Sequence, residues 1–475
     1  MEKRSLTYFV EACRGRLAGG DPQAPVCGVS TDSRTIRPGE LFIALVGEKF
    51  DGHTFIEAVI DKGASAVLVE NIRVKQADIE RWSQRIGVIV VENTKVALGD
   101  IARRYRQDFD IPVVAVCGSN GKSTTKEFIA SVLAQRFATH KSPASFNNDI
   151  GVPLTLLGIE SVHKAAVIEV GTNHPGELKP LLLMAMPRYG VITTIGREHL
   201  GFFGSLEAVA KEEGTIAEVL PPNGKLFVCL DGLNNTGDNQ DLIAESVLRR
   251  CRAPVITVGS GGKSNWRARL LNADIDKTRF LVESPEGEYE GEYEVKLTGR
   301  HNITNALLAI ALGSEFGLTK TEIQNGLKNA APPYMRMQSR QWRGTIILND
   351  AYNANPDSMK AALRALSELE CAGKKIAVIG TMAELGSYSQ AAHKEAGELA
   401  AKFGINCVIA VGEYSGLTAE SAKNAGVNTV YACDDARAAA DKLKLICSRG
   451  DIVLIKASRS ARLEKTIEFL LSEES

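Results

Sequence analysis

The stretch VVAVCGSNGKSTTK at residues 113–126 decides the fold and raises the question of what the chain binds. Its first five residues form an apolar run typical of a buried strand, and the residues from Ser123 onward have the spacing of an amphipathic helix. Gly118 and Gly121 therefore lie in a strand-to-helix turn, where backbone N–H groups and the helix N-terminus can hold a phosphate group. The strict GxxxxGK[ST] pattern is not met, because Val116 occupies the place of its first glycine.

The side chains of this loop, taken in order, predict a nucleotide site. Lys122 is placed to reach the outer phosphates, and the Ser123 hydroxyl is placed to bind Mg²⁺. The competing interpretation is a Gly-Ser-Asn-Gly turn that only precedes a helix, but it does not explain why Lys, Ser and Thr follow in this order. We therefore predict that the phosphates are bound by Gly118, Ser119, Asn120, Gly121, Lys122, Ser123 and Thr124.

The length and the pattern of apolar runs predict the domain organisation. A chain of 475 residues is too long for one hydrophobic core, and about 150 residues per domain predicts three domains. Strand-like runs alternate with helical stretches, which predicts an α/β fold with parallel sheets. We predict a small α/β N-terminal domain over residues 1–108, a central mononucleotide-binding domain with a phosphate loop over 109–330, and a Rossmann-like α/β domain over 331–475. The polar residues 283–299 predict a small antiparallel excursion.

The composition is that of an ordinary globular enzyme, with 44% hydrophobic and 24% charged residues and a formal net charge of −1. This balance argues against a basic surface that binds nucleic acid or an anionic membrane. The N-terminal residues lack the apolar core of a signal peptide, and we find no run of about 18 apolar residues that could span a bilayer. Nine scattered cysteines without a CxxC pair indicate buried thiols in a reducing cytoplasm.

Two side chains downstream of the loop are candidates for metal binding. Glu169 lies near the carboxyl end of a predicted inner strand, where the ligands of α/β proteins gather. A carboxylate in such an apolar run costs free energy unless it is paired or bound to metal, so a structural ion pair is the alternative. His199 follows another strand and is placed to touch metal or phosphate, although a histidine there is more often a satisfied structural residue.

With these pieces placed, the chain resembles the Mur ligases, the ATP-dependent amide-forming family of peptidoglycan assembly. The loop of that family has the shorter form GxNGK[ST], which Gly118 to Ser123 match, so the missing first glycine is a family feature. The resemblance runs nearly end to end, over STDSRTIRPGELFIALVGEKFDGHTFI (30–56), NNDIGVPLTLL (147–157), EVGTNHPGE (169–177), GRHNITNALLA (299–309), NDAYNANPDSM (349–359) and IKASRS (455–460).

Within the family, TNHPGE and DAYNANPDSM resemble the branch that adds D-alanyl-D-alanine to the UDP-N-acetylmuramoyl tripeptide. The branch that adds the third amino acid typically has His-Thr-Pro in place of Asn-Ala-Asn-Pro, and we do not find its Asp-Asn-Pro-Arg signature here. Folylpolyglutamate synthases share the middle domain but resemble the N-terminal block poorly. The resemblance thus implies a cytoplasmic ligase that uses ATP and Mg²⁺, without nucleic-acid or membrane partners, and we expect a monomer.

The resemblance also implies roles at matching positions on the nucleotide side. Ser123 and Glu169 would hold Mg²⁺, and His199 would help to hold a second Mg²⁺. Arg336 would reach the γ-phosphate, and Asn302 would face the adenine end of ATP, whereas Asn305, one turn on, is equally placed to be a packing residue. The ribose would be held by Asp350, with Tyr352 and Asn353 beside it, the alternative for Asp350 being a turn residue after a strand.

On the side of the other substrates the resemblance implies three groups of residues, each with a competing structural role. The uridine diphosphate would be contacted by Thr31, Asp32, Ser33 and Arg34, which otherwise form an ordinary polar turn. The muramoyl part would meet Asn147 and Asn148, which otherwise cap a helix. The incoming amine would be received near Lys456, Ser458 and Arg459, which otherwise form a solvated basic turn.

One departure from the family pattern concerns Glu213. This branch usually has a lysine 14 residues after the histidine that matches His199, and that lysine is carbamylated to bridge Mg²⁺. Here the position is Glu213, and Lys211 is a poor replacement because a two-residue offset points to another face of a helix. We predict that the Glu213 carboxylate replaces the carbamate as an oxygen ligand.

The implied chemistry is activation of a carboxylate by ATP, followed by attack of an amine on the acyl phosphate. Lys122, Arg336 and the metal ions would offset the charge between a carboxylate and a triphosphate, with His199 and Glu213 completing the catalytic set. Two rival interpretations are a ligase of the same family with a different amine substrate and a non-catalytic nucleotide switch.

Overall fold

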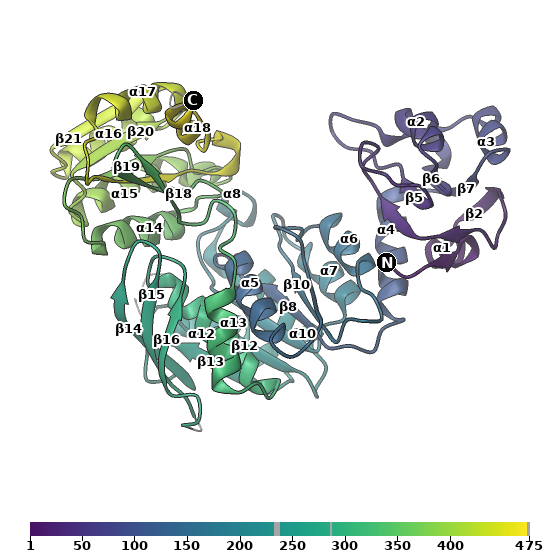
Figure 1. Ribbon diagram of the computed structural model, residues 1–475, viewed down its shortest axis with the longest axis horizontal. Coiled ribbons are helices and arrows are strands. Elements are labelled where there is room, and N and C mark those ends of the chain that lie inside the picture. The colour runs from purple at the N-terminus through teal and green to yellow at the C-terminus, as the bar shows by residue number, and fades with distance from the viewer. Residues whose placement is uncertain (232–237, 286, 473–475) are drawn as a thin grey trace. The chain divides into compact units, whose positions relative to one another are not determined.

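The structure, a computed structural model, describes residues 1–231, 238–285 and 287–472, and it divides into two compact units (Figure 1). The first unit comprises Met1–Ala115, Phe137–Thr172 and Lys179–Arg188, and the second comprises Val116–Arg136, Asn173–Leu178 and Tyr189–Ser475. Strand β8 (Val113–Cys117), which precedes the phosphate loop, contains the division between the units.

The first unit contains a five-stranded sheet in the order β2-β7-β6-β5-β4. Its strands are β2 (Arg16–Gly19), β4 (Gly28–Ser30), β5 (Glu40–Ile43), β6 (Ala66–Glu70) and β7 (Gly87–Val91). The strands β4 to β7 pair in parallel, and β2 pairs antiparallel to β7. The apolar runs LFIAL, SAVLVE and VIVVE overlap β5, β6 and β7. This unit also holds the short antiparallel pair β1 (Arg4–Ser5) and β3 (Pro25–Val26), and the parallel pair β9 (Thr139–Lys141) and β10 (Ala165–Glu169).

The second unit continues from β8 with a run of neighbouring strands in the order β16-β15-β14-β13-β12-β11. These are β11 (Tyr189–Ile192), β12 (Lys225–Cys229), β13 (Val255–Gly259), β14 (Trp266–Ala273), β15 (Thr278–Glu283) and β16 (Gly291–Val295). The strands β11 to β14 pair in parallel, and β14 to β16 pair antiparallel. The predicted antiparallel excursion is therefore present, but it begins earlier, at β14, whose exposed polar residues hid it from the sequence pattern.

A six-stranded sheet forms the C-terminal part of the second unit, in the order β17-β18-β22-β19-β20-β21. Its strands are β17 (Gln338–Trp342), β18 (Thr345–Asp350), β19 (Lys375–Ile379), β20 (Cys407–Val411), β21 (Thr429–Cys433) and β22 (Ile452–Lys456). All pairs are parallel except β17 with β18. The predicted α/β class with parallel sheets is thus confirmed.

Two helix boundaries follow signals that the sequence shows. The predicted helix after the phosphate loop is α5, and α13 ends shortly before Pro332 and Pro333, where the residue preceding a proline disfavours helix. In chain order the α-helices are α1 (Leu6–Cys13), α2 (Ile56–Asp61), α3 (Gln76–Ser83), α4 (Thr94–Arg106), α5 (Lys122–Leu133), α6 (Gly151–Leu157), α7 (Leu178–Ala185), α8 (Leu200–Phe203), α9 (Leu206–Glu213), α10 (Thr215–Val219), α11 (Asp238–Ser246), α12 (His301–Glu315), α13 (Lys320–Asn329), α14 (Pro356–Glu368), α15 (Ser389–Lys402), α16 (Ser415–Asn424), α17 (Ala436–Ile446) and α18 (Lys465–Leu471).

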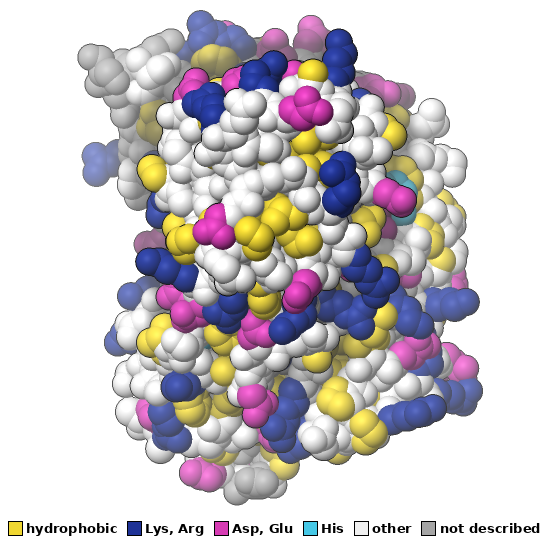
Figure 2. Space-filling view, turned by 90° about the vertical axis from the view of Figure 1, so that its right-hand side faces the viewer, with side chains coloured by type: hydrophobic (Ala, Val, Ile, Leu, Met, Phe, Trp, Pro, Cys, Tyr) yellow, Lys and Arg dark blue, Asp and Glu magenta, His cyan; other side chains and the backbone are white. Residues whose placement is uncertain are grey.

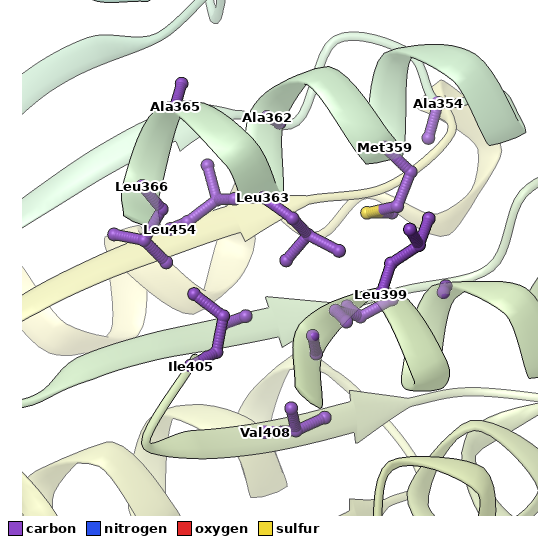
Figure 3. Close-up of a cluster of buried hydrophobic side chains, with 14 of the residues drawn as sticks. Ala354, Met359, Ala362, Leu363, Ala365, Leu366, Leu399, Ile405, Val408 and Leu454 are labelled. Atoms are coloured by element: carbon purple, nitrogen blue, oxygen red, sulfur yellow. The ribbon is translucent and has the colours of Figure 1, made fainter. Parts of the chain in front are cut away.

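The core of the C-terminal sheet shows why its inner strands are mostly apolar. Successive side chains of a strand point to opposite faces, so on β22 Leu454 packs in one buried cluster while Val453 and Ile455 pack in the other. Figure 3 shows the first cluster, in which Met359 and Leu363 of α14 point towards the strands and α15. Because helices cover both faces, the inner strands β20 and β22 are buried throughout, whereas the edge strands β17 and β21 carry exposed residues.

Helix α14 begins at a strong capping signal. The Asn355 side chain accepts from the Ser358 N–H, the Ser358 hydroxyl accepts from the Asn355 N–H, and Pro356 stands at the first helical position. The start of α14 is therefore fixed by local sequence as well as by its buried face.

The surface agrees with the charge balance of the chain. On the face shown in Figure 2, acidic and basic side chains are interspersed with apolar ones. Within the described residues, no helix is long and apolar enough to cross a membrane. All nine cysteines are free thiols.

The first prediction concerns the cluster of Figure 3. Leu363 has no exposed surface, so Leu363→Ala should lower the free energy of unfolding by about 2–5 kcal/mol through lost burial and a residual cavity. Urea denaturation followed by tryptophan fluorescence, with buried Trp342 on the same sheet as reporter, measures the change. The matched control is Leu445→Ala, whose leucine is 79% exposed and should change stability by less than about 0.5 kcal/mol. Equal losses in the two variants would contradict the assigned core.

Candidate active site

The phosphate loop is held in a conformation that only glycine adopts at two positions. Gly118 has φ +116° and Gly121 has φ +87°, both in the left-handed region. A Cβ atom on Gly118 would lie 2.4 Å from the Thr193 hydroxyl oxygen, and one on Gly121 would lie 2.3 Å from the Asn305 amide oxygen. Neighbouring segments therefore pack directly on the backbone of the loop.

The segment after β11 anchors the loop by hydrogen bonds. The Ser119 N–H donates to the Thr194 carbonyl at 2.8 Å, and the Asn120 N–H donates to the Thr194 hydroxyl at 3.0 Å. The Gly196 N–H donates to the Ser119 hydroxyl at 2.9 Å. A segment distant in sequence thus holds the turn at the N-terminus of α5 in place.

Lys122 lies within this turn with its charge compensated. Its ammonium donates to the Gly118 carbonyl at 2.6 Å and lies 3.2 Å from the Glu198 carboxylate. Burial raises the pKa of Glu198, but Lys122 and His199 outweigh this effect and hold that pKa below its ordinary value. A phosphate group entering the loop would compete with Glu198 for the lysine.

His199 lies between two carboxylates. Its Nδ1 is 2.6 Å from Glu384, and its Nε2 is 3.4 Å from Glu198. Burial lowers the pKa of His199, yet the interactions with Glu198 and Glu384 raise it overall to about 9. The imidazole is therefore protonated at neutral pH and would have to release a proton before it could bind a metal ion.

Glu213, at the end of α9, is buried directly behind the loop. Its Oε2 accepts the Gly118 N–H at 2.7 Å, and burial raises its pKa to about 7 although Lys122 acts in the opposite direction. Lys211, two residues earlier, is exposed, which confirms that the two side chains lie on different faces of the helix. The residue that departs from the family pattern thus contacts the phosphate loop itself.

Glu169, the other predicted metal-binding carboxylate, lies at the end of β10 in the first unit. It is 1% exposed, its Oε1 accepts from the Asn147 amide at 2.9 Å, and its N–H donates to the Ser142 hydroxyl at 2.9 Å. Asn147 is thereby tied to Glu169, whereas Asn148 accepts from the Ile150 and Gly151 N–H groups at the start of α6, the competing capping role.

A cavity of about 390 Å³ lies in the second unit. One wall comes from the loop and α5, another from β13, β14 and α12, and a third from the C-terminal sheet and α14. Predicted site residues that line it are Asn120, Gly121, Ser123, Thr124, Asn302, Asn305, Arg336, Asp350 and Lys456. The volume, and a mixed lining of apolar and polar side chains, suit a small-molecule ligand of nucleotide size.

A buried ion pair forms the C-terminal wall. Lys456, 1% exposed, donates to Asp350 at 2.7 Å and to the Asn353 carbonyl at 2.9 Å. Burial lowers the pKa of Lys456 while Asp350 acts in the opposite direction. The alternative of a solvated basic turn is therefore wrong for Lys456. Its ammonium contacts Asp350, the residue predicted to hold the ribose.

Arg336 lies over the Tyr352 ring, with its guanidinium carbon 4.6 Å from the ring centroid. Its neighbours Met335 and Met337 are non-glycine residues with φ of +54° and +50°, and the Met337 N–H donates to Asp350 at 3.2 Å. Backbone strain of this kind persists where the surrounding structure imposes it, as at binding sites.

Two asparagines of α12 pack beneath the loop. Asn305 accepts from the Thr125 hydroxyl and donates to Asn302, both at 3.2 Å, and Asn302 donates to the Thr298 carbonyl at 2.8 Å. These contacts give Asn305 the packing role that the sequence left open, while Asn302 and Asn305 both also line the cavity.

The remaining predicted residues make local contacts. Asp32 accepts both from the N–H and from the guanidinium of Arg34, hydrogen bonds that lower its pKa to about 2, and the Ser33 carbonyl accepts from Lys62 at 2.7 Å. The Ser458 hydroxyl accepts the Ala383 N–H at 2.8 Å, and exposed Arg459 pairs with Glu464. Thr31 is half-buried in the same turn as Asp32.

Three charged residues of the site were missed from the sequence. Glu198 and Arg197 directly precede His199, and Glu384 follows β19, so each stands just after a strand end, where functional side chains of α/β sheets collect. Their partners lie far away in sequence, which left no pattern to find. Among the described residues, no cluster of three or more His, Cys, Asp and Glu side chains is arranged to hold a metal ion.

Three family models match consecutive parts of the chain. The Mur ligase family catalytic domain matches residues 25–106, the Mur ligase middle domain matches 116–313, and the Mur ligase glutamate ligase domain matches 335–459.

Relatives and solved structures match over nearly the whole length. The UDP-N-acetylmuramoyl-tripeptide--D-alanyl-D-alanine ligase of Bacillus subtilis (strain 168) is 33% identical, covering 99% of each chain, and that of Escherichia coli (strain K12) is 34% identical, covering 98% of each. A crystal structure of MurF from Acinetobacter baumannii superimposes with a TM-score of 0.87 at 27% identity, covering 99% of each chain. MurF from Thermotoga maritima, in complex with ADP, superimposes with a TM-score of 0.78 at 25% identity, covering 94% of this chain and 98% of that one. The chain belongs to the Mur ligase family.

Proposed function

We propose that this chain is the ATP-dependent ligase that joins D-alanyl-D-alanine to the UDP-N-acetylmuramoyl tripeptide in peptidoglycan precursor synthesis. The observation that carries the proposal is the 390 Å³ cavity, in which the phosphate loop and the Asp350–Lys456 pair line one space. The full-length relatives are named for this reaction, which supports the choice of substrates.

We assign the binding of the substrates to three domains, with boundaries near residues 108 and 330. The N-terminal domain would bind the UDP-sugar through Thr31 to Arg34, and Asn147 and Asn148 would meet the muramoyl part. The central domain would bind the ATP phosphates, and the C-terminal domain would bind ribose through Asp350 and Tyr352. Since ATP and UDP-linked precursors are the substrates, we place the reaction in the cytoplasm and propose that a monomer performs it.

The first step activates the carboxylate. An oxygen of the terminal carboxylate of the tripeptide attacks the γ-phosphorus of ATP, the bond to the β,γ-bridging oxygen breaks, and ADP leaves with the electron pair. Lys122 would move from Glu198 to the phosphate oxygens, and Arg336 would offset the charge that builds up on the γ-phosphoryl group.

The second step forms the amide. The amine of D-alanyl-D-alanine attacks the acyl carbon, the tetrahedral intermediate expels inorganic phosphate, and the nitrogen loses a proton. Ser458 and Arg459 stand at the end of β22, beside the nucleotide wall, and would orient the dipeptide. Holding both reactants in one site converts a bimolecular step into an effectively unimolecular one.

The oxygen donors of the second unit fit Mg²⁺ by their chemistry, because Ser123 offers a hydroxyl and Glu213 a carboxylate, the hard ligands that Mg²⁺ prefers. Glu169, in the first unit, offers a carboxylate of the same kind. When bound, the ion would neutralise charge on the phosphates. His199 would join this set only after it gives up its proton and its contact with Glu384.

The second prediction is the reaction itself. Purified protein supplied with ATP, Mg²⁺, UDP-N-acetylmuramoyl tripeptide and D-alanyl-D-alanine should release ADP and form the pentapeptide in equal amounts, as measured by a coupled ADP assay and mass spectrometry. Running diaminopimelate- and lysine-containing tripeptides in parallel identifies the third residue. Single amino acids in place of the dipeptide serve as the control. ADP release that does not depend on either peptide substrate would contradict the proposal.

The third prediction follows from the raised pKa of Glu213. The unfolded chain ionises this carboxyl near pH 4.5 and the folded chain near pH 7, so folded protein binds the extra proton between these values. Stability from this group is present below pH 4.5 and is lost as the pH rises through 7. Relative to Glu213→Gln, which cannot ionise, the wild type should lose on the order of 2 kcal/mol between pH 5 and 8.

Chemical denaturation in the presence of EDTA at a series of pH values measures this difference. The matched control is Glu207→Gln, on the same helix but fully exposed with a lowered pKa, which should show no trend over this range. If the difference in unfolding free energy between the wild type and Glu213→Gln did not change with pH either, Glu213 would be ionised throughout this range.

The fourth prediction concerns Glu213 as a replacement for carbamylated lysine. Glu213→Gln keeps an acceptor for the Gly118 N–H but loses the anion, so it should raise the Mg²⁺ concentration needed for half-maximal activity by tenfold or more, about 1.4 kcal/mol. Glu213→Lys should regain activity when bicarbonate is added, because the lysine can then form a carbamate. Wild-type activity should not respond to bicarbonate, and an unchanged Mg²⁺ dependence in Glu213→Gln would refute the replacement.

A further inference from the structure

Arg197 joins the segment that anchors the phosphate loop to the C-terminal part of the second unit. Its guanidinium donates to Asp357 at 2.8 and 3.0 Å and to both oxygens of Glu395 at 2.7 and 3.0 Å. We call these three residues the Arg197 clamp. Two carboxylates on one planar guanidinium form a directional, charge-assisted contact.

The backbone reinforces the same contact. The Arg197 N–H donates to the second oxygen of Asp357 at 2.7 Å, and a Cβ atom on Gly196 would lie 2.8 Å from that oxygen. The approach between the two segments is therefore too close for any side chain at position 196.

The clamp is continuous with the phosphate loop. Gly196 is hydrogen-bonded to Ser119, and the Asn355 side chain donates to the Asn120 side chain at 2.9 Å. Asn355 and Asp357 frame the start of α14, which the core cluster of Figure 3 holds on its sheet. A rigid path thus leads from the loop, through Arg197, to the C-terminal wall that carries Asp350.

The clamp itself does not face the nucleotide space. Of the described residues that line the cavity, none is Arg197, Asp357 or Glu395. Asp357 is 2% exposed, so removing Arg197 would leave a buried carboxylate without its cation, which costs more than breaking a surface ion pair. Any effect of Arg197 on nucleotide binding must therefore pass through the walls that the clamp connects.

We propose that Arg197 is a positioning residue that holds the phosphate loop and the C-terminal wall in the geometry that binds nucleotide. The proposal rests on the proposed function as an ATP-dependent ligase. When the clamp is lost, only a fraction of the molecules has both walls in place, and the apparent dissociation constant for nucleotide rises by the reciprocal of that fraction.

The test is titration calorimetry of ADP with Mg²⁺, which needs no acceptor substrate. Arg197→Met should raise the dissociation constant of ADP about tenfold or more, while the stoichiometry stays at one and the affinity for the UDP-linked tripeptide is unchanged. Arg197→Lys keeps the charge but not the planar guanidinium, so its dissociation constant for ADP should lie between those of the wild type and Arg197→Met. A merely structural role would instead lower the stoichiometry and affect both ligands.

The matched control is Arg136→Met. Arg136 also makes a two-pronged contact with a carboxylate in the second unit, to Glu322, but it connects α5 to α13 away from the cavity. Its loss should leave the dissociation constant of ADP within twofold of the wild type.

A second variant keeps the proposal falsifiable if Arg197→Met does not fold. Glu395 is partly exposed, so Glu395→Gln should fold, and it should weaken ADP binding about threefold. In the double variant with Arg197→Met, ADP binding should be no weaker than in Arg197→Met alone, because residues that act as one unit have non-additive effects. An unchanged dissociation constant in Glu395→Gln and Arg197→Lys overturns the clamp. Wild-type protein that binds ADP but does not ligate D-alanyl-D-alanine would refute the proposed acceptor and leave the clamp standing, whereas failure of the wild type to bind ADP would refute both.

Discussion

The close packing of the loop backbone at Gly118 and Gly121 is the constraint on which the site depends. Neither position has room for a Cβ atom, because Thr193 and Asn305 approach within contact distance of the backbone. The loop is therefore shaped by the segment after β11 and by α12, and hydrogen bonds from the N–H groups of Gly118, Ser119 and Asn120 to Glu213 and Thr194 fix its backbone before any nucleotide arrives. Such preorganisation is what makes electrostatic stabilisation of transferring phosphoryl groups effective.

The second feature that organises the site is the pairing of buried charges. Lys122 forms an ion pair with Glu198, and Lys456 forms one with Asp350. His199 lies between the carboxylates of Glu198 and Glu384. An unpaired charge in such surroundings costs several kcal/mol, so each cation has its partner in place. In the proposed function, nucleotide binding would exchange the Glu198 carboxylate for phosphate oxygens at Lys122.

Sequence reasoning found the residues whose identity is set locally and missed those whose partners are distant. The loop from Gly118 to Thr124 follows β8 directly, so periodicity and turn chemistry indicated it, whereas the role of Asp350 was implied by the family resemblance. Glu198, Arg197 and Glu384 carry no local signal, because their roles arise from contacts across more than 70 residues of chain. Contacts in the fold also bear on the open alternatives: Asn148 accepts the Gly151 N–H at the start of α6, Asn305 packs under the loop, and Lys456 is buried and not solvated.

The sequence by itself determined the α/β class, the family and the phosphate loop, since these depend on apolar periodicity, glycine positions and contiguous motifs. The tertiary structure decided the protonation of His199 and Glu213 and the link between the loop and α14, because pKa values and ion pairs depend on burial and on neighbours that only folding brings together. Glu213 shows the difference most clearly. In the sequence it is an unexpected residue in a family pattern, and in the fold it is a buried carboxyl that accepts the N–H of the first glycine of the loop.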